Sequence, residues 1–413
     1  MTTPPAQPAR RHTVPLLILG WVAARVLMVV LYAADDFVGR SLAWGDLALY
    51  EFWAQQIRDT GAMPDGVTWM YPPLAAPVLL LADALPGSFG SGFVLLVLAA
   101  DLAVLALLLR AVVREGGHRT GAWAWVVLVP LLGLIAWARL DLLPVAAAAG
   151  ALLLAAARPV LAGVLAALGT AVKAWPVVLG LLFLRERRWL AGAVGAGLLL
   201  ALVLTLLLDD AWGFVANLSG RGIQVESVLA LPWTLQQALG GTVDGDFVNG
   251  TYEVLEPGTE VLAVVAPLLM VTAVGAGLWS SRHRAPALRW YVAVTALLAT
   301  SPLLSTQFVL WLVGGAAVAA VLPGRDGDLA RRTLPLVGVV VLLSHLTFPL
   351  QWGGLVGDGQ LAAWTLLTRN VLLLALAGRL LVTARGGAAH PAPEALGQPQ
   401  RGTGSPDSSA ASR

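Results

Sequence analysis

The stretch SGFVLLVLAADLAVLALLLRAVVREGGHR, residues 91–119, contains the pattern that decides the fold of this chain. Its first part, 91–109, is nearly all apolar and is long enough for a helix that crosses a bilayer, which takes roughly 20 residues. The apolar run ends in a gap that carries Arg110, Arg114 and Arg119. Short loops rich in arginine stay on the cytoplasmic side of a membrane. The stretch therefore predicts a transmembrane helix that ends in the cytoplasm.

Arginines and acids alternate in the gaps between the other apolar runs. Acids dominate the two long gaps, 34–90 and 209–260, which we therefore expect to be outer loops. Arginines dominate the gaps expected in the cytoplasm, which hold Arg185, Arg187 and Arg188; Arg282, Arg284 and Arg289; and Arg325, Arg331 and Arg332. The pattern predicts a polytopic membrane protein whose chemistry takes place at the outer face of the cell membrane.

The composition agrees with a membrane protein. The chain has 58% hydrophobic and 12% charged residues, whereas about 25% of the residues of a soluble domain are charged. The sequence has no cysteine, which excludes disulfides, thiol catalysis and Cys-based metal sites, and no glycine-rich cofactor loop, so we expect neither metal nor cofactor. The net charge of +2 comes from arginines on inner loops, so the expected partners include membrane lipids and exclude nucleic acid.

The apolar runs predict an all-α fold with about 12 transmembrane helices and both termini in the cytoplasm. A tail, 1–13, precedes a single transmembrane domain, 14–385, and a disordered cytoplasmic tail, 386–413, follows it. The first run lacks a small-residue cleavage pattern, so it is interpreted as an anchor. The predicted spans are 14–33, 91–109, 122–137, 142–157, 160–172, 174–184, 189–208, 261–279, 290–300, 307–322, 333–349 and 361–383.

One apolar piece, 72–86, does not fit as a span, because counting it would move the arginine loop at 110–119 outside. We place it as a juxtamembrane or re-entrant helix on the outer side, begun by Pro72 and Pro73. Non-helical backbone at membrane depth must be covered by protein or line a cavity. The piece therefore indicates a cavity near the outer face.

Lys173 is the only lysine of the chain. The stretch around it, 160–184, has arginines at both flanks, so Lys173 is expected at an outer turn between two short apolar segments. Such short segments indicate a thinned bilayer or a pocket, since a bilayer core is about 30 Å thick. Lys173 is either a lysine whose charged end reaches the membrane surface or a point charge that holds an anionic group such as a phosphate.

Three further ionisable residues have two interpretations each. Arg139 and Asp141 flank an outer turn in 122–157, where they form a local ion pair or where Arg139 binds a phosphate and Asp141 orients it. Asp46 begins a segment, 46–58, whose apolar positions fit a helix lying on the membrane surface. There Asp46 either caps the helix N-terminus or supplies a carboxylate to a reaction.

Short motifs occur in a fixed order along the chain, and their order and placement on one face are together fairly specific. They are Gly45-Asp46 to Tyr50, Tyr71-Pro72-Pro73-Leu74, Arg139-Leu140-Asp141, Ala171 to Pro176, Arg221 to Ser227, and Ser301-Pro302 to Trp311. In these motifs the chain resembles the polyprenyl-phosphate-mannose-dependent mannosyltransferases of actinobacteria, which are of the glycosyltransferase family 87 type and adopt the GT-C fold. That family builds phosphatidylinositol mannosides and related envelope glycans. The resemblance covers about residues 14–380.

The resemblance implies a role for individual residues. Asp46 would match the catalytic aspartate and act as general base on the acceptor hydroxyl. Lys173, Arg139 and Arg221 would contact the lipid phosphate of the donor, and the helix at 72–86 would line the groove for its lipid tail. The other substrate-binding residues that it implies are Tyr71, Pro72, Asp141, Glu226 and Gln307. The segment from Ser301 to Gln307 lacks the histidine that mannosyltransferase members often carry, which leaves the mannose assignment open.

The chemistry of a lipid-linked sugar gives the same expectation. Transfer needs a base on the acceptor side and cations that take up the negative charge of the leaving phosphate. A single acid without a second nucleophile favours one inverting displacement. We therefore expect a glycosyltransferase with a polyprenyl-phosphate sugar donor and a lipid or glycan acceptor. The alternatives are a lipid or solute transporter, which would use the same intramembrane charges, and a non-catalytic assembly subunit.

Overall fold

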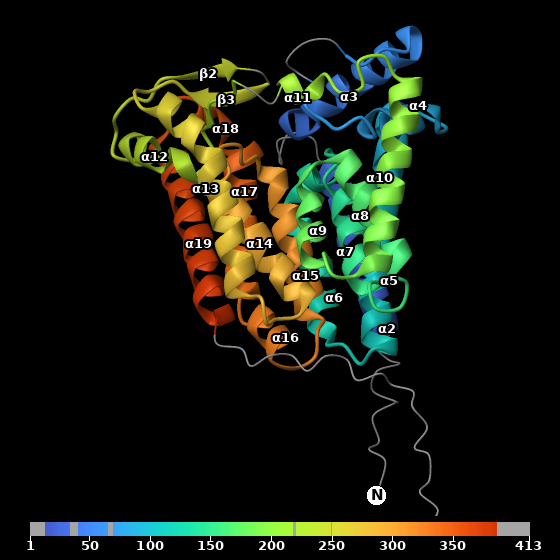
Figure 1. Ribbon diagram of the computed structural model, residues 1–413. Helices are drawn as coiled ribbons and strands as arrows, with labels where there is room; N and C mark the ends of the chain where they lie inside the picture. The colour runs from blue at the N-terminus through green and yellow to red at the C-terminus, as the bar shows by residue number, and fades with distance from the viewer. Residues whose placement is uncertain (1–12, 34–39, 65–68, 218–219, 249, 386–413) are drawn as a thin grey trace, which may run out of the picture.

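The computed structural model describes residues 13–33, 40–64, 69–217, 220–248 and 250–385, which are mostly helical (Figure 1). In these ranges six segments are long and apolar enough to cross a membrane, which confirms the prediction of a polytopic membrane protein. The predicted tails, except Thr13, lie outside the described residues. Five of the six segments correspond to single helices, α2 (Thr13–Ala33), α5 (Phe89–Arg114), α10 (Arg187–Leu207), α13 (Thr259–Ser280) and α19 (Gln360–Arg385). The remaining segment, Gly324–Leu350, includes α17 (Leu334–His345).

Shorter apolar helices take the places of the other predicted spans and lie among the long ones. Every residue of α15 is buried, which suits a helix that is apolar all round. Glycine lets α8 and α10 approach closely, because a side chain at Gly163 would meet the backbone of Trp189. The shorter helices are α6 (Arg119–Leu131), α7 (Leu142–Leu153), α8 (Pro159–Val172), α9 (Val178–Leu182), α14 (Pro286–Thr300) and α15 (Val309–Ala320).

The acidic and the arginine-rich loops lie at opposite ends of the helices, as the charge pattern predicts (Figure 1). At one end the N–H of Met63 donates to the carbonyl of Asp209 (3.1 Å), which joins the two acidic loops. At the other end the N–H of His118 donates to the carbonyl of Val321 (2.8 Å), which joins two arginine-rich loops beside α16 (Gly324–Arg331). We call these the acidic end and the arginine end.

The acidic loop at 209–260 contains a small antiparallel sheet that the all-α prediction did not include. Its three strands are ordered β1-β3-β2. They pack with parts of α19 around a separate small core that includes Ile223, Val254 and Leu366. The elements of the loop at 209–260 are α11 (Phe214–Asn217), β1 (Ile223–Gln224), α12 (Leu231–Ala238), β2 (Gly245–Val248) and β3 (Thr251–Val254), and α18 (Trp352–Leu355) contributes to the same small core.

Helix α3 (Arg40–Thr60) corrects two expectations about the segment 46–58. Asp46 lies inside the helix, so it is not the N-cap. The apolar face is covered by protein and does not lie on the membrane surface, because α3 packs on α4, α5 and the turn after α6. The buried residues of that face are Leu47, Tyr50, Trp53, Ala54 and Ile57. The position of Asp46 is therefore fixed by protein contacts.

The outer helix predicted at 72–86 is α4 (Ala75–Ala84), which follows Pro72 and Pro73. At about 1.5 Å per residue it is too short to cross a bilayer. It packs against α3 and α5 at the acidic end (Figure 1). A side chain at Gly92 of α5 would meet the backbone of Ala82, so a glycine is needed for this close approach.

Candidate functional site

Charged residues from three separate parts of the chain meet at the acidic end, where they form two ion pairs. Nε of Arg139 lies 2.8 Å from Oδ2 of Asp46 on α3. Nζ of Lys173, which follows α8, donates to both carboxylate oxygens of Asp141, at 2.8 and 2.9 Å. The local ion pair between Arg139 and Asp141 that the sequence allowed is therefore wrong, since each of them pairs with a residue distant in the chain.

The turn that carries Arg139 is fixed by the way α6 ends. Gly133 has a φ of +64°, which glycine adopts readily, and it turns the chain into a short 3-10 helix before α7 begins. Nη1 of Arg139 donates to the carbonyls of Ala43 (2.8 Å) and Ala138 (2.9 Å), and the residue is only 3% exposed. These bonds hold the guanidinium against α3, so that its Nε faces Asp46.

Lys173 lies among three aromatic rings and the carboxylate of Asp141. Its Nζ is 4.3 Å from the ring centre of Phe308, 5.3 Å from that of Trp311 and 5.7 Å from that of Tyr71. The indole N–H of Trp311 donates to Oδ1 of Asp141 at 2.6 Å. Ring faces attract a compact ammonium. The ammonium is held in place by these contacts, and the Lys173 side chain is 14% exposed, so a small part of the side chain remains accessible.

Tyr71 lies close to both ion pairs, and its hydroxyl is 2.8 Å from that of Tyr50. Burial, together with the carboxylates of Asp46 and Asp141, raises the pKa of Tyr71 well above its usual value. Tyr71 therefore stays a neutral hydrogen-bond donor at physiological pH. We call Asp46, Tyr71, Arg139, Asp141 and Lys173 the charge cluster. In the described ranges no group of three or more His, Asp or Glu residues could hold a metal ion.

The other predicted site residues lie around the charge cluster. Burial lowers the pKa of Arg221, and the carboxylate of Glu253 opposes this shift. An electrostatic interaction with the hydroxyl of Tyr71 links Arg221 to the cluster. Pro72 lines an apolar groove described below. Gln307 is half-buried in the short helix Thr306–Phe308, next to a ring that contacts Lys173.

Glu226 is buried where the loop at 209–260 meets the segment from Ser301 to Thr306. It is 3% exposed and accepts a hydrogen bond from Oγ1 of Thr306 at 2.6 Å. Burial raises the pKa of Glu226, while Arg369 and Thr306 lower it. The neighbouring Ser227 donates to the carbonyl of Ser301 at 2.6 Å. Glu226 and Ser227 thus tie the loop at 209–260 to the segment from Ser301 to Thr306.

Sequence reasoning missed four residues that build this region. Phe308 and Trp311 lie in the motif from Ser301 to Trp311, but no sequence pattern indicates their contact with Lys173. Arg369 and Asn370 lie fully buried in α19, where Nη2 of Arg369 donates to the carbonyl of Glu226 (2.9 Å) and Nδ2 of Asn370 donates to that of Ser227 (3.1 Å). A charged side chain inside an apolar run must find a polar partner. That signal was present for Arg369.

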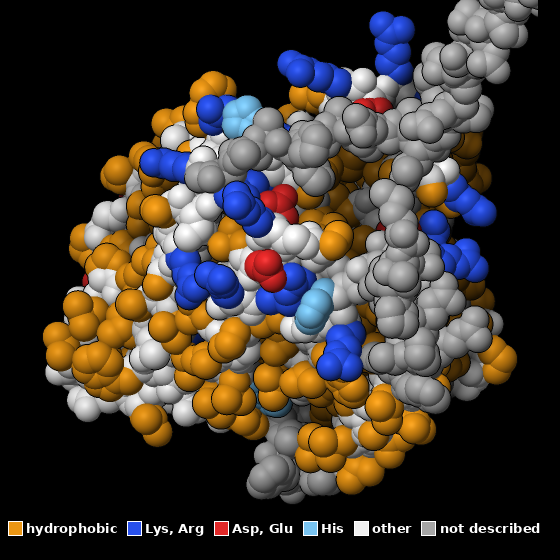
Figure 2. All heavy atoms as spheres, turned by 90° about the horizontal axis from the view of Figure 1, so that it is seen from below, with side chains coloured by type: hydrophobic (Ala, Val, Ile, Leu, Met, Phe, Trp, Pro, Cys, Tyr) orange, Lys and Arg blue, Asp and Glu red, His pale blue; other side chains and the backbone are white. Residues whose placement is uncertain are grey.

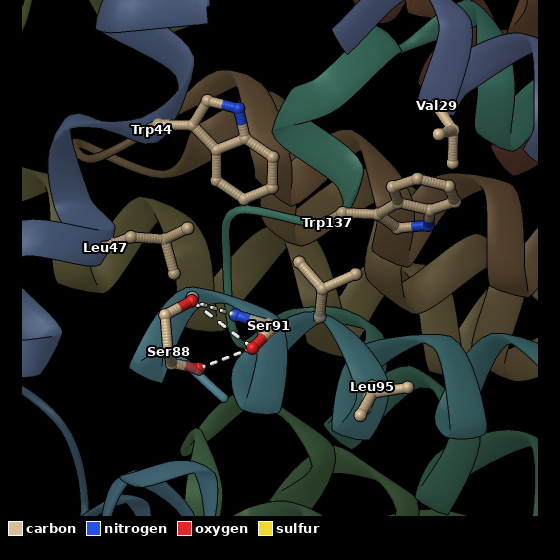
Figure 3. A pocket seen from close by; sticks show the side chains of 9 residues that line it. Val29, Trp44, Leu47, Ser88, Ser91, Leu95 and Trp137 are labelled. Atoms are coloured by element: carbon tan, nitrogen blue, oxygen red, sulfur yellow. Dashed lines mark hydrogen bonds between the residues drawn. The ribbon is translucent and has the colours of Figure 1, made fainter. Parts of the chain in front are cut away.

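Two apolar grooves are lined by sequence neighbours of the charge cluster, and each is of a size that suits a ligand. The first, of about 530 Å³, lies next to Asp46, since Trp44 and Leu47 of α3 line it together with Trp137 (Figure 3). Figure 3 also shows Ser91 of α5, and Ser88 directly before this helix, on another side of the groove. The second, of about 420 Å³, lies next to Lys173, because Ala171 and Ala174 are among its lining residues with parts of α8 and α10.

Comparison with known proteins assigns this chain to a family. The model of glycosyltransferase family 87 matches residues 69–306, which is more than half of the 413 residues. Asp46 and Gln307 lie outside the matched range, and every other predicted site residue lies inside it. No curated protein matches the sequence. The protein is a glycosyltransferase with several membrane-spanning helices, and it belongs to glycosyltransferase family 87.

Proposed function

We propose that the protein transfers a sugar from a polyprenyl-phosphate donor to a lipid or glycan acceptor at the outer face of the cell membrane, with inversion of the anomeric carbon. The charge cluster carries this proposal. It holds one accessible carboxylate, Asp46 (42% exposed), beside the two cations Arg139 and Lys173 and next to apolar grooves. Membership of a glycosyltransferase family favours an enzyme over a transporter. Mannose is the sugar that the sequence resemblance favours.

The groove beside Lys173 suits the lipid tail of the donor. It is lined by Pro72 and Pro73, and the N–H of Leu74 donates to the carbonyl of Ala171 (3.1 Å), which ties this segment to α8. A polyprenyl chain in this groove would place its phosphate near Lys173. Arg139 and Lys173 would then stabilise the negative charge that grows on the phosphate as the sugar leaves. Tyr71 would donate a further hydrogen bond.

Asp46 would act on the acceptor. The acceptor oxygen attacks the anomeric carbon and gives its proton to Asp46, while the bond from that carbon to the phosphate oxygen breaks and its electron pair stays on the phosphate. A single displacement of this kind inverts the configuration. The groove lined by Trp44 and Leu47 lies beside Asp46 and would hold an apolar part of the acceptor.

The proposed enzyme has the GT-C fold in one domain, 14–385. The six long segments and the shorter apolar helices together would make about 12 spans. The shorter helices pack against the long ones, and a thinner hydrophobic thickness at the charge cluster would let them complete the crossing. In this arrangement the loop at 34–90 carries the base and the loop at 209–260 covers the other side of the cluster.

The donor is tested with purified protein in liposomes that contain a lipid extract as acceptor. We expect radiolabelled mannose from polyprenyl-phosphate mannose to appear in a lipid or glycan product at a rate proportional to enzyme. Polyprenyl-phosphate glucose and a nucleotide-linked mannose are the control donors. Transfer from the nucleotide-linked sugar alone would refute the lipid donor, and movement of intact donor across the bilayer without any transfer would support a transporter.

Sidedness is tested with single cysteines, because the native sequence has none. We expect an impermeant thiol reagent to label Thr60→Cys and Asp246→Cys in intact cells, because both residues are exposed at the acidic end. Glu115→Cys and Asp328→Cys, exposed at the arginine end, should react only after the cells are opened. Labelling of Glu115→Cys from outside would reverse the proposed orientation.

A further inference from the structure

A pocket at the arginine end lies far from the charge cluster and has a different character. It has a volume of about 290 Å³ and is lined by Arg284, Arg325, Asp328, Leu329, Arg332 and Thr383. Figure 2 shows this end with basic side chains gathered over its surface, and they are arginines because the only lysine, Lys173, lies at the other end. The pocket brings together residues from the loop before α14, from α16 and from the last turn of α19.

One wall of the pocket is held by a network that centres on Arg284. Its Nη1 donates to Oδ1 of Asp326 at 3.0 Å, its Nε to the carbonyl of Ala384 at 3.0 Å, and its Nη2 to that of Thr383 at 3.1 Å. The other oxygen of Asp326 accepts the N–H of Ala285 at 2.7 Å. The negative charge of Asp326 is therefore engaged in the wall, and the three segments are joined into one frame.

The remaining charges of the pocket are mostly positive. Arg325 and Arg332 are exposed, and within the described part of the chain neither forms an ion pair or a hydrogen bond through its side chain. Asp328, the one acid of the lining, pairs with Arg331 at 2.6 Å. Burial first, and then the charges of Arg331 and Arg119, lower the pKa of the nearby His118, which is consistent with a positive potential at this end.

The surroundings of the pocket place it at the depth of lipid headgroups. Trp279, near the end of α13, is 70% exposed, and the guanidinium of Arg282 lies 4.5 Å from its ring centre. Exposed tryptophans next to cations mark the interface between the bilayer and water. Val382, beside Thr383 of the lining, is 68% exposed on an apolar helix. A headgroup in the pocket would therefore have apolar surface next to it for its acyl chains.

We propose that this pocket binds the phosphate of an anionic phospholipid in the membrane leaflet at the arginine end. The guanidinium groups of Arg325 and Arg332 pair with phosphate oxygens, since planar guanidinium suits this geometry. Basic pockets between transmembrane helices bind lipid headgroups in this way. The lipid is neither donor nor acceptor. Because it binds the folded protein, in which Arg325 and Arg332 line one pocket, it stabilises the folded state.

The test measures the melting temperature of the detergent-solubilised protein with added short-chain lipids. We expect dioctanoyl phosphatidylglycerol to raise the melting temperature by roughly 3–8 °C near saturation. Phosphatidylcholine of the same chain length and inorganic phosphate should have no such effect. High salt should reduce the shift, because it screens exposed charges. An equal shift with phosphatidylcholine, or with inorganic phosphate alone, would refute an anionic lipid as the ligand.

Variants show whether the shift arises in this pocket. Arg325→Gln/Arg332→Gln should abolish the phosphatidylglycerol shift, and each single variant should reduce it. The matched control is Arg187→Gln/Arg188→Gln, which removes two exposed arginines from another loop and should keep the full shift. A full shift in the Arg325/Arg332 double variant, or an equal loss in the control, would overturn the proposal. The single variants keep this comparison possible if the double variant does not fold.

Discussion

Asp46→Asn should lower sugar transfer by on the order of 10²–10⁴-fold while the protein stays folded. Asparagine has the shape of aspartate but cannot accept the proton of the acceptor hydroxyl. The side chain of Asp46 is 42% exposed, but that of its partner Arg139 is only 4% exposed, so the change leaves a buried cation without its carboxylate. The amide oxygen of asparagine can still accept a hydrogen bond, and Arg139 keeps its bonds to Ala43 and Ala138. A moderate loss of stability is therefore expected, and the melting temperature is measured beside the kinetics.

The kinetic constants separate a base from a residue that only positions Arg139. Loss of the base lowers kcat and leaves the KM for the donor nearly unchanged, whereas a loosened Arg139 raises the donor KM. Asp59→Asn, at the exposed end of the same helix, is the matched control and should transfer at the wild-type rate. Asp46→Glu should retain little activity, because the longer arm moves the carboxylate out of line. Near-normal transfer by Asp46→Asn would remove Asp46 from the mechanism.

The long helices and their arrangement could be predicted because the signal is local. A run of about 20 apolar residues forms a span wherever it occurs, and the arginines of short loops set the order of the ends. This is why the predicted spans at 91–109 and 189–208 correspond to α5 and α10. The positions of the shorter helices were predicted nearly as well. Whether these helices cross a membrane also depends on the thickness of the lipid around them, which the sequence does not specify.

The pairing of charges could not be predicted, because it depends on tertiary contacts. Arg139 and Asp141 are two residues apart and favour a local ion pair by proximity, yet the turn after α6 directs them to different partners. In the same way Arg25 and Asp101 lie in separate predicted spans. In the structure Nε of Arg25 is 2.7 Å from Oδ2 of Asp101, and both are buried. An ionisable group within a span signals a partner without identifying it.

Helix α3 shows how packing decides what a pattern means. The spacing of Leu47, Tyr50 and Trp53, three residues apart, predicts a helix with one apolar face, and this is confirmed. The pattern is the same for a helix on a membrane and for a helix on a protein. In the structure the apolar face of α3 packs on protein, because it contacts α4 and α5. Those contacts also bring the carbonyl of Ala43 to Arg139, which no local pattern could show.

The second large effect concerns Lys173. Lys173→Ala should lower kcat/KM for the donor on the order of 10²-fold, because the proposed site would then have one positive charge fewer to stabilise the leaving phosphate. The same change leaves Asp141, with a side chain only 1% exposed, without its cation, so a loss of about 3–5 kcal/mol of stability is also expected. The melting temperature must therefore be measured beside the kinetics.

Lys173→Arg separates the two effects. Its charge keeps Asp141 paired, so the melting temperature should return close to that of the wild type. A planar guanidinium does not fit where a compact ammonium lies 4.3 Å from the ring centre of Phe308 and 5.3 Å from that of Trp311, so transfer should be restored only in part. If Lys173→Arg recovered both stability and full donor kinetics, any cation would serve there. If a folded Lys173→Ala protein kept the donor KM and kcat of the wild type, Lys173 would be the structural partner of Asp141 and the phosphate would bind elsewhere.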